Sequence, residues 1–354
     1  MRHIQTKSDS ELILQLAIAR ITFLKFHEKV ILSKKLDSLR SLVLLSMEEI
    51  SSTVNRTINS RSVWNGKETL HMAEMALHYC KALNIHIILN TDKEYPDLLK
   101  NINDPPYLLF CRGNPEILES ARTVSVVGTR RLTPNGRECA RSFAYDAALN
   151  GCTVISGLAN GADGYAHEGV LNAYYDTLEK GGDASKLGKT VAVLPSAIDE
   201  IVPYGHRRLA AKIIETGGCL ISEYEPKMPM ANWHFVGRNR IIAGLSPATV
   251  VIEAPAGSGA LITADFALEY NRDVMFHRAA FESSAVKIAK ESKKKLDVDF
   301  AAGKVSKYKV ENTLEKYIEA GAPVIKDYND YCECLSEVPG KRTQGYAGRI
   351  ILTM

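Results

Sequence analysis

The sequence predicts an α/β fold: a Rossmann-like, doubly wound, mostly parallel sheet with a small N-terminal helical domain. From residue 122 on, short apolar runs alternate with segments of helical periodicity, as in parallel strands joined by helical crossovers. Most runs are apolar at nearly every position, which suits a sheet buried on both faces. A chain of 354 residues, 45% of them hydrophobic, is long enough to build both parts.

Apolar residues at helical spacing mark the first part of the chain. Leu12, Leu16 and Ala19 begin this pattern, which continues to about residue 82 with polar breaks between its segments. Such spacing predicts amphipathic helices with one buried face. We therefore expect a helical domain over residues 1–83, SAM-like or similar.

The next part, residues 84–337, is predicted to form one Rossmann-like domain. Two apolar runs, 85–89 and 107–111, bracket proline-containing stops, and we expect them to join a sheet edge. Alternating strands and helices follow. The expected strands are 124–127, 153–156, 190–194, 219–223, 249–253 and 274–276. The expected helices are 135–149, 163–175, 205–215, 238–245 and 261–270.

Two segments of this domain read as insertions, near 176–189 and 283–309. The first is glycine- and lysine-bearing and poor in apolar residues, which predicts a mobile surface loop. The second carries eight lysines and is interpreted as a solvated helical face, an interpretation compatible with a binding patch. Residues 314–335 are expected to form a helix, a short strand at 323–325 and a further helix, and 338–354 a tail.

Charge and cysteine content restrict the classes of function. The net charge is only +3, so nucleic-acid affinity would have to come from a local arrangement of charges. Seven dispersed cysteines favour a reducing compartment, and we expect a cytoplasmic protein. Cys332 and Cys334 are interpreted as two thiols on a terminal helix. The apolar stretch 12–19 is too short to span a membrane, so no membrane association is expected.

Glycine-rich turns after the predicted strands are the most informative feature. Gly128, Thr129, Arg130 and Arg131 follow the first parallel strand; the glycine permits close backbone approach, and hydroxyl and guanidinium groups bind phosphate oxygens. The alternative is an ordinary turn with exposed arginines. Because carboxyl ends of parallel strands share one edge of the sheet, we expect these turns to converge on one phosphate-binding crevice.

A second turn follows the next strand and contains Ser156, Gly157 and Asn160. It leads into a helix on which Asp163 and His167 are four residues apart and share a face. That pair could be catalytic, but without a nucleophile we interpret it as bracing the loop. Neither turn supplies G-x-G-x-x-G, which disfavours NAD or FAD; no cofactor and no metal are expected.

A third element is the run Arg238-Asn239-Arg240, expected to open a helix where free N–H groups already favour anions. Phe235 precedes it, together with Trp233. Such aromatic residues are more often part of a core, but beside two arginines they could also stack on bases.

The last turn places Ser258 and Gly259 at another expected helix start, able to hold phosphate through backbone amides. Glu253 closes the preceding strand. One carboxylate without a partner is a weak indication of catalysis.

These segments resemble the DprA/Smf (DNA processing protein A) family. The resemblance spans roughly residues 85–276. It is carried by the motifs GTR (128–130), SGLANGADGYAH (156–167), HRRL (206–209), SEYEP (222–226), FVGRNRIIAGLS (235–246) and SGALITA (258–264).

The resemblance implies a non-enzymatic protein that binds single-stranded DNA during natural transformation, protects it and helps load the RecA recombinase. It also implies a homodimer formed through the Rossmann-like domain. Carried over to this chain, it makes Arg130, Arg238 and Arg240 the candidate DNA contacts. Further candidates for phosphate contact are Gly128, Ser156, Gly157, Ser258 and Gly259, whereas Asp163, His167 and Glu253 are taken as structural.

A rival interpretation is a nucleotide sensor or phosphoribohydrolase of the LOG-like Rossmann type. Those proteins resemble P-G-G-x-G-T-x-x-E, and the corresponding stretch here, 255–263, lacks the glutamate. The missing carboxylate argues against hydrolysis.

Overall fold

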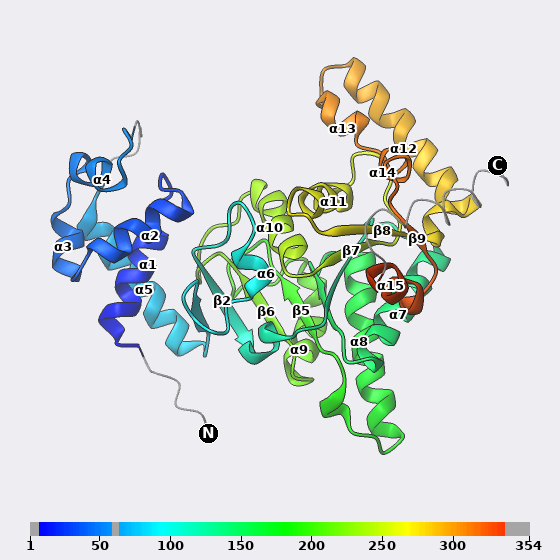
Figure 1. The fold of residues 1–354 in the computed structure, drawn as a ribbon, viewed down its shortest axis with the longest axis horizontal. Helices are drawn as coiled ribbons and strands as arrows, with labels where there is room; N and C mark the ends of the chain where they lie inside the picture. The colour runs from blue at the N-terminus through cyan, green and yellow to red at the C-terminus, as the bar shows by residue number, and fades with distance from the viewer. Residues whose placement is uncertain (1–6, 59–63, 337–354) are drawn as a thin grey trace.

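A computed structural model describes residues 7–58 and 64–336. Within them, nine strands form a single sheet, and a group of helices that precedes the sheet in sequence lies at one end of the molecule (Figure 1). The predicted tail, 338–354, lies outside the described residues. No helix in the described ranges is long and apolar enough to cross a membrane.

The N-terminal part is helical, as its periodicity predicts. Its helices are α1 (Asp9–Ala19), α2 (Phe26–Lys35), α3 (Leu39–Leu44), α4 (Met47–Val54) and α5 (Gly66–Ala82). Ser8, Ser38, Ser46 and Asn65 cap four of them by accepting a backbone N–H, which satisfies donors that a helix start leaves free.

The N-terminal helices share an apolar core with the sheet. Leu16 and Leu32 belong to the same buried cluster as Phe110 and Leu220 of the sheet. Tyr107 donates a hydrogen bond to the Gln15 side chain over 2.5 Å. The domain boundary near residue 84 therefore stays a prediction.

Seven parallel strands and two antiparallel edge strands make up the sheet of the described chain. The two expected edge runs pair antiparallel with each other, and the second one also pairs antiparallel with the strand Cys219–Ser222. In spatial order the strands are β1 (His86–Leu89), β2 (Leu108–Gly113), β6 (Cys219–Ser222), β5 (Thr190–Val193), β4 (Thr153–Ser156), β3 (Thr123–Val127), β7 (Ala248–Val251), β8 (Asp273–His277) and β9 (Val324–Ile325).

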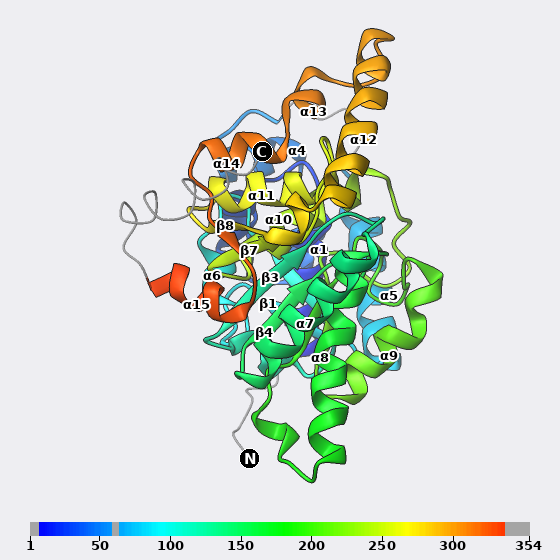
Figure 2. The same ribbon diagram turned by 90° about the vertical axis from the view of Figure 1, so that its right-hand side faces the viewer.

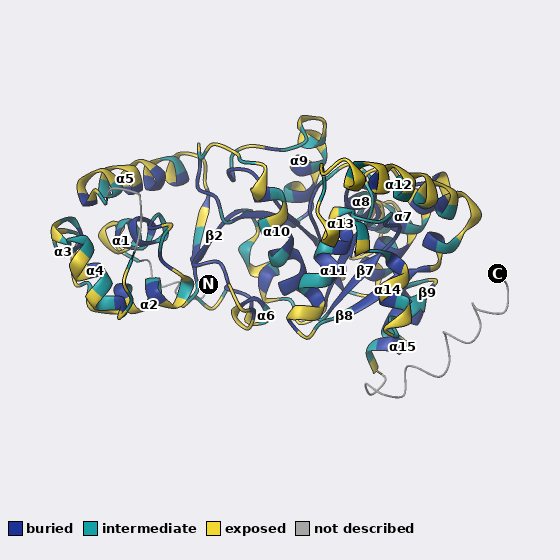
Figure 3. Ribbon diagram, turned by 90° about the horizontal axis from the view of Figure 1, so that it is seen from above, coloured by how far each residue is buried: buried dark blue, intermediate teal, exposed yellow. Residues whose placement is uncertain are grey.

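Helices cover both faces of the sheet, so the fold class is confirmed. Val124 and Val126 of β3 belong to the cluster formed with helices α7 (Pro134–Leu149) and α8 (Ala162–Glu179). Val127 belongs to the cluster formed with helices α10 (Trp233–Gly244) and α11 (Gly259–Glu269). Strand side chains point alternately to opposite faces. Figure 3 shows the buried strands between helices whose outer faces are exposed.

The helices after β1 follow the predicted order. They are α6 (Asp97–Lys100), α7 (Pro134–Leu149), α8 (Ala162–Glu179), α9 (Arg207–Glu215), α10 (Trp233–Gly244), α11 (Gly259–Glu269), α12 (Ser283–Ala301), α13 (Lys307–Glu311), α14 (Leu314–Glu319) and α15 (Tyr328–Ser336). Short 3-10 turns occupy η1 (Pro115–Glu119), η2 (Ala184–Lys186), η3 (Tyr204–His206) and η4 (Arg278–Phe281). Cys332 and Cys334 lie on α15, as expected.

Two helix boundaries differ from the prediction by four or five residues, and the others agree within two. α10 begins at Trp233 and not at Arg238. The buried His234 ring stacks on Tyr224 with 3.8 Å between ring centroids, and this tertiary contact anchors a first turn that the low helix propensity of Gly237 disfavours. α8 continues to Glu179, so the first four residues of the loop predicted at 176–189 are helical.

The order of the strands reverses beside β3. The chain passes from β3 through β4 and β5 to β6 on one side and returns to β7 on the other. In doubly wound sheets, ligands bind at the carboxyl ends of the strands next to such a reversal. The loops after β3, β4 and β7 meet there.

Candidate nucleic-acid interface

The three glycine-rich loops converge as predicted. The Thr129 backbone N–H donates to the Glu253 carbonyl over 2.7 Å, and the Ala162 N–H donates to the Thr129 carbonyl over 3.2 Å. Gly161 has a φ of +83°, and a Cβ there would lie 2.2 Å from the Thr129 carbonyl oxygen. Only glycine permits this approach. The β3 loop is therefore held between the β4 and β7 loops.

A pocket of about 240 Å³ opens at this junction. It lies where α8 begins, and the positive end of the helix dipole favours an anion there, although the N–H groups of Ala162 and Gly164 already have backbone partners. Its lining residues come from three segments: Arg130, Leu132, Arg137, Asn160, Gly161, Gly164, Tyr165, Glu168 and His206.

Arg130 is exposed, and its guanidinium lies over the Phe235 ring at 5.5 Å from the centroid. Arg131 is exposed beside it. Within the described residues, no carboxylate pairs with Arg130. An arginine held on an aromatic face with its donors free is well placed to bind a phosphate.

Arg137 reaches the same pocket from the first turns of α7. Thr133 caps this helix by accepting from the Gly136 N–H over 2.9 Å. Glu253 in turn accepts from the Thr133 N–H over 3.0 Å and from its hydroxyl over 2.6 Å. Glu253 is thus used to position α7, and burial raises the pKa of its carboxyl.

Arg238 was predicted to contact DNA directly, and its position conflicts with that role. Its side chain is buried, and Nη1 donates to the Val193 carbonyl over 2.8 Å. A Cβ at Gly157 would lie 1.6 Å from this Nη1, so the guanidinium fills the space under the β4 loop. Burial lowers its pKa to about 10, which still leaves it charged at neutral pH.

Arg240 and Asn239 are also engaged within the protein. Arg240 Nη2 lies 2.7 Å from a Glu223 oxygen, and its Nε lies 3.0 Å from Asp104. Asn239 is buried and donates to the Gly259 carbonyl over 3.2 Å. Because α10 begins five residues earlier than predicted, these residues lie inside the helix and not at its anion-binding start.

The predicted hydroxyl and glycine contacts, like the predicted arginines, lie partly beside the pocket and partly inside the fold. Gly128 and Thr129 lie in the β3 loop directly before the lining residue Arg130 but do not line the pocket themselves. The Thr129 hydroxyl accepts from the Arg131 N–H over 3.2 Å. Ser156 is buried and donates to the Val126 carbonyl over 2.6 Å. Ser258 and Gly259 line no part of the pocket.

Asp163 and His167 do not bond to each other. The Asp163 carboxylate accepts from the N–H groups of Gly157 at 3.1 Å and Ala159 at 3.3 Å, so it braces the β4 loop, as interpreted from the sequence. His167 Nδ1 lies 2.7 Å from the Thr190 hydroxyl. Burial raises the pKa of Asp163 and lowers that of His167 to about 3.

Sequence reasoning missed four residues of this surface: Arg137, Tyr165, His206 and Arg207. Tyr165 carries the guanidinium of Arg137 at 5.9 Å, and His206 Nδ1 lies 2.8 Å from the Leu158 carbonyl. The exposed Arg207 lies 4.0 Å from the centroid of the exposed Tyr204 ring. The HRRL motif (206–209) was a signal that could have identified the last two.

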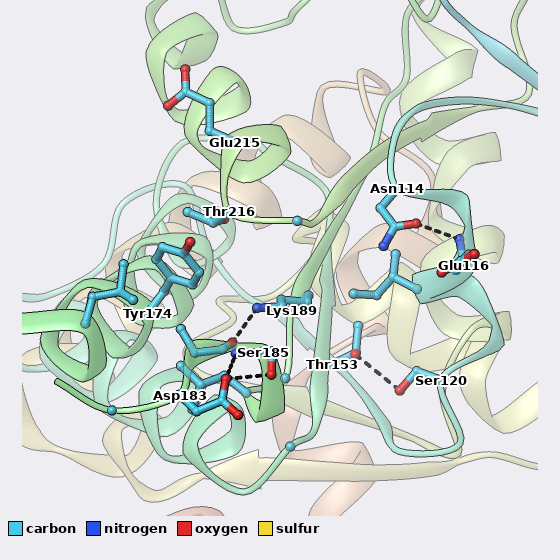
Figure 4. Close-up of a pocket in the computed structure, with 18 residues that line it drawn as sticks. Asn114, Glu116, Ser120, Thr153, Tyr174, Asp183, Ser185, Lys189, Glu215 and Thr216 are labelled. Carbon is cyan, nitrogen blue, oxygen red and sulfur yellow. Dashed lines mark hydrogen bonds between the residues drawn. The ribbon is translucent and has the colours of Figure 1, made fainter. Parts of the chain in front are cut away.

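A larger hollow of about 730 Å³ lies at the opposite edge of the sheet. Figure 4 shows Lys189 and Thr153 there, at the amino ends of β5 and β4. The Lys189 ammonium donates to the Ala184 carbonyl over 2.8 Å. Asp183, Glu116 and Glu215 give this hollow a partly acidic lining, which makes it a poor phosphate site. No group of residues in the described ranges could hold a metal ion.

The sheet is of the doubly wound α/β class, and the candidate site is a pocket at the carboxyl ends of its strands that is lined by the exposed Arg130 and Arg137. Residues 86–336 match the family model described as DNA recombination-mediator protein A. The chain belongs to this family, and the resemblance to DprA/Smf proteins is confirmed.

Relatives of known name agree with this assignment. The chain is 31% identical to Protein Smf of Borreliella burgdorferi over 90% of its own length and 94% of that protein. It is 35% identical to DNA processing protein DprA of Bacillus subtilis, where the match covers 54% of this chain and 59% of the relative. The chain spans half the length, 50%, of Protein Smf of Escherichia coli.

Solved structures show the same fold. DNA processing protein A from Streptococcus pneumoniae superposes with a TM-score of 0.63 at 24% identity, covering 93% of this chain and 98% of that one. The Helicobacter pylori protein superposes with a TM-score of 0.53 at 22% identity, covering 72% and 96%. The latter structure is described in terms of that protein's unique single-stranded DNA binding mode.

Proposed function

We propose that this chain binds the backbone of single-stranded DNA in the pocket formed by the β3 and β4 loops. The observation that carries the proposal is a group of exposed arginines without carboxylate partners: Arg130 and Arg137 line the pocket, and Arg131 and Arg207 directly follow the lining residues Arg130 and His206. Arginines bind backbone phosphates whatever the base sequence, and the affinity for DNA then falls steeply as the salt concentration rises.

Exposed aromatic side chains, one of them Tyr204 beside Arg207, favour a single strand over a duplex. Tyr204 is 72% exposed and Trp233 is 66% exposed. Unpaired bases stack on exposed rings with little sequence preference, whereas the bases of a duplex are already stacked and paired. Phe235, half-buried under Arg130, serves to position that guanidinium.

We infer a binding role and not a catalytic one. The carboxylates near the pocket already have partners: Asp163 braces the β4 loop, Glu253 holds Thr133, and Glu168 lies 3.3 Å from Arg141. The phosphoribohydrolase alternative requires a free carboxylate. Release of free base from nucleoside monophosphates would restore that alternative.

The family assignment extends the proposal to partners. We propose that the chain acts in the cytoplasm as a homodimer, receives single-stranded DNA during natural transformation, protects it and transfers it to the RecA recombinase. A pull-down with RecA, with and without single-stranded DNA, tests this step. RecA capture that is stronger with DNA supports delivery, and no capture in either condition contradicts it.

Filter binding of labelled oligo-dT tests the pocket. In the double variant Arg130→Ala/Arg137→Ala we expect an affinity loss of at least about tenfold and a log–log salt slope reduced by about 1.4, two phosphate contacts at about 0.7 each. Arg40→Ala/Lys67→Ala is the matched control, because it removes two exposed positive charges from the N-terminal helices. Unchanged affinity and slope in the pocket variant would eliminate the proposed site.

Tryptophan fluorescence tests the stacking. The chain has two tryptophans, and Trp64 is half-buried with its indole donating to the Leu45 carbonyl. Trp64→Phe therefore leaves Trp233 as the reporter. Oligo-dT should quench its emission, and abasic oligomers of equal charge should not. Equal quenching by both would contradict stacking.

A further inference from the structure

The segment that follows β8 carries an unusual concentration of positive charge. Residues 283–311, which form α12 and α13, contain eight lysines against four carboxylates, whereas the whole chain has a net charge of only +3. Lys293 forms an ion pair with Asp297, and Lys307 forms one with Glu311. Within the described residues, the other lysines of this segment have no carboxylate partner.

Three of these lysines share one face of α12. Lys287, Lys290 and Lys294 follow i, i+3, i+7 spacing, which places them in one stripe. The buried residues of the helix, Ala285 and Leu296, lie on the opposite side. Nineteen residues at 1.5 Å per residue give a helix of roughly 28 Å. The lysine stripe is thus a solvent-facing row on an extended support.

Packing holds the two helices in place as an arm. The Asp265 carboxylate of α11 accepts hydrogen bonds from Tyr308 at 2.6 Å and Asn312 at 2.7 Å. A Cβ built at Gly257 would lie 3.1 Å from the Leu296 side chain, and the Gly257 N–H donates to the Asn312 carbonyl over 3.0 Å. The arm is therefore fixed against the loop after β7.

The arm also begins beside the arginine pocket. The Asn135 side chain, in the first turn of α7 and two residues before Arg137, donates to Glu282 over 2.8 Å. Glu282 directly precedes α12. Figures 1 and 2 show α12 and α13 projecting from the body of the protein, and Figure 1 places the N-terminal helices at the far end.

We propose that the lysine stripe of α12 is a second contact surface for the same DNA strand, which binds the phosphates of nucleotides that extend beyond the arginine pocket. This inference rests on the proposed function. Lysine ammonium groups are flexible point charges that suit a backbone without defined register, whereas the arginines of the pocket supply planar, fixed donors. An acidic partner protein is the alternative occupant, since the same helix also exposes Val298 and Phe300, and DNA binding by the α12 variant that equals that of the wild type would favour it.

Two oligomer lengths separate the two surfaces. An oligo-dT of about six nucleotides fills the pocket alone, and one of about twenty also reaches the arm. In Lys287→Gln/Lys290→Gln/Lys294→Gln we expect roughly tenfold weaker binding of the long oligomer and a salt slope lower by about 2. Binding of the short oligomer should be unchanged. Lys34→Gln/Lys35→Gln/Lys67→Gln is the matched control, because all three lysines are exposed on or beside the N-terminal helices.

The outcomes distinguish this inference from the proposed function. If Arg130→Ala/Arg137→Ala weakens both lengths while the α12 variant binds both like the wild type, the arm is not a DNA surface and the pocket stands. If the α12 variant weakens both lengths equally, the separate-surface inference is overturned. If the arginine variant binds both lengths normally, the proposed function itself fails. Circular dichroism and a thermal melt confirm that each variant is folded.

Discussion

Arg130 and Arg238 lie on either side of the same glycine-rich loop, and their environments are opposite. Arg130 is exposed, rests on Phe235 and has no carboxylate partner among the described residues. Arg238 is 4% exposed and donates to a backbone carbonyl inside the fold. Both belong to motifs that read as phosphate-binding. The comparison shows that two arginines of the same sheet edge differ in burial: the buried one supports a loop, and the exposed one presents its guanidinium to solvent.

Besides Arg238, two buried carboxylates also hold the loops of this edge in place. Asp163 holds the β4 loop from below through two backbone N–H groups, and its charge favours the protonated state of Arg238. Glu253 does the same for the start of α7. Buried charged groups therefore fix the loops that carry the exposed arginines.

The largest expected effect is on stability. Arg238→Ala leaves the buried Asp163 without its compensating charge and empties the space under Gly157, so we expect a loss of about 3 to 5 kcal/mol in the free energy of unfolding. Urea denaturation measures it. Arg238→Met retains most of the side-chain volume, so its loss of stability measures the effect of removing the charge alone. A loss below about 1 kcal/mol would contradict a supporting role.

Gly157→Ala tests the same contact from the other side. Its Cβ would lie 1.6 Å from Arg238 Nη1, so the guanidinium must move, and we expect a destabilisation of up to about 3 kcal/mol. At Gly205 a Cβ meets nothing within 4 Å, which makes Gly205→Ala the matched control. Equal thermal stability of the two variants would show that the loop and Arg238 accommodate the added methyl group without cost, which contradicts the prediction.

The buried histidine predicts a pH dependence. The pKa of His167 is about 3 in the fold, below the ordinary value of about 6.5, so protonation favours the unfolded chain. Its contribution is complete above about pH 6.5 and is lost as the pH falls toward 3, amounting to about 2 kcal/mol between pH 7 and 5. His167→Gln should flatten that part of the stability profile, and His71→Gln, at an exposed site, should not. Parallel profiles for the wild type and His167→Gln would refute it.

The smallest expected effect is the change in stability when the exposed arginines are replaced. Arg130→Ala/Arg137→Ala should change the free energy of unfolding by no more than about 0.5 kcal/mol, although we expect it to weaken DNA binding. Chemical denaturation of this variant beside Arg238→Ala provides the comparison. If both lose stability equally, the division between ligand-binding and supporting arginines is wrong.

Much of the fold could be predicted from the sequence because its strands are short and almost wholly apolar. The bounds of β4 match the prediction residue for residue, and β3 and β5 differ by one residue at one end. The start of α10 could not be predicted, since it depends on His234 stacking on Tyr224, ten residues away. Local propensity does not contain such contacts.

The candidate site was predicted in part. The convergence of the loops follows from strand order, so Arg130 and Asn160 were placed correctly at the pocket. Which arginine is buried depends on which side chain fills the gap under Gly157, and no local pattern encodes that. Arg137 was missed because it lies on a helix, one turn beyond Thr133, and not in a glycine-rich turn. Whether these residues contact DNA stays a prediction.

The apolar cluster that joins the N-terminal helices to the sheet has a consequence for how the protein loses its structure. Because Leu16 and Leu32 share one core with Phe110 and Leu220, melting the helices would expose the face of the sheet at β2 and β6. Heating should therefore produce one calorimetric transition, with calorimetric and van't Hoff enthalpies that agree. A fragment that starts at residue 84 would present that uncovered face to its neighbours and aggregate.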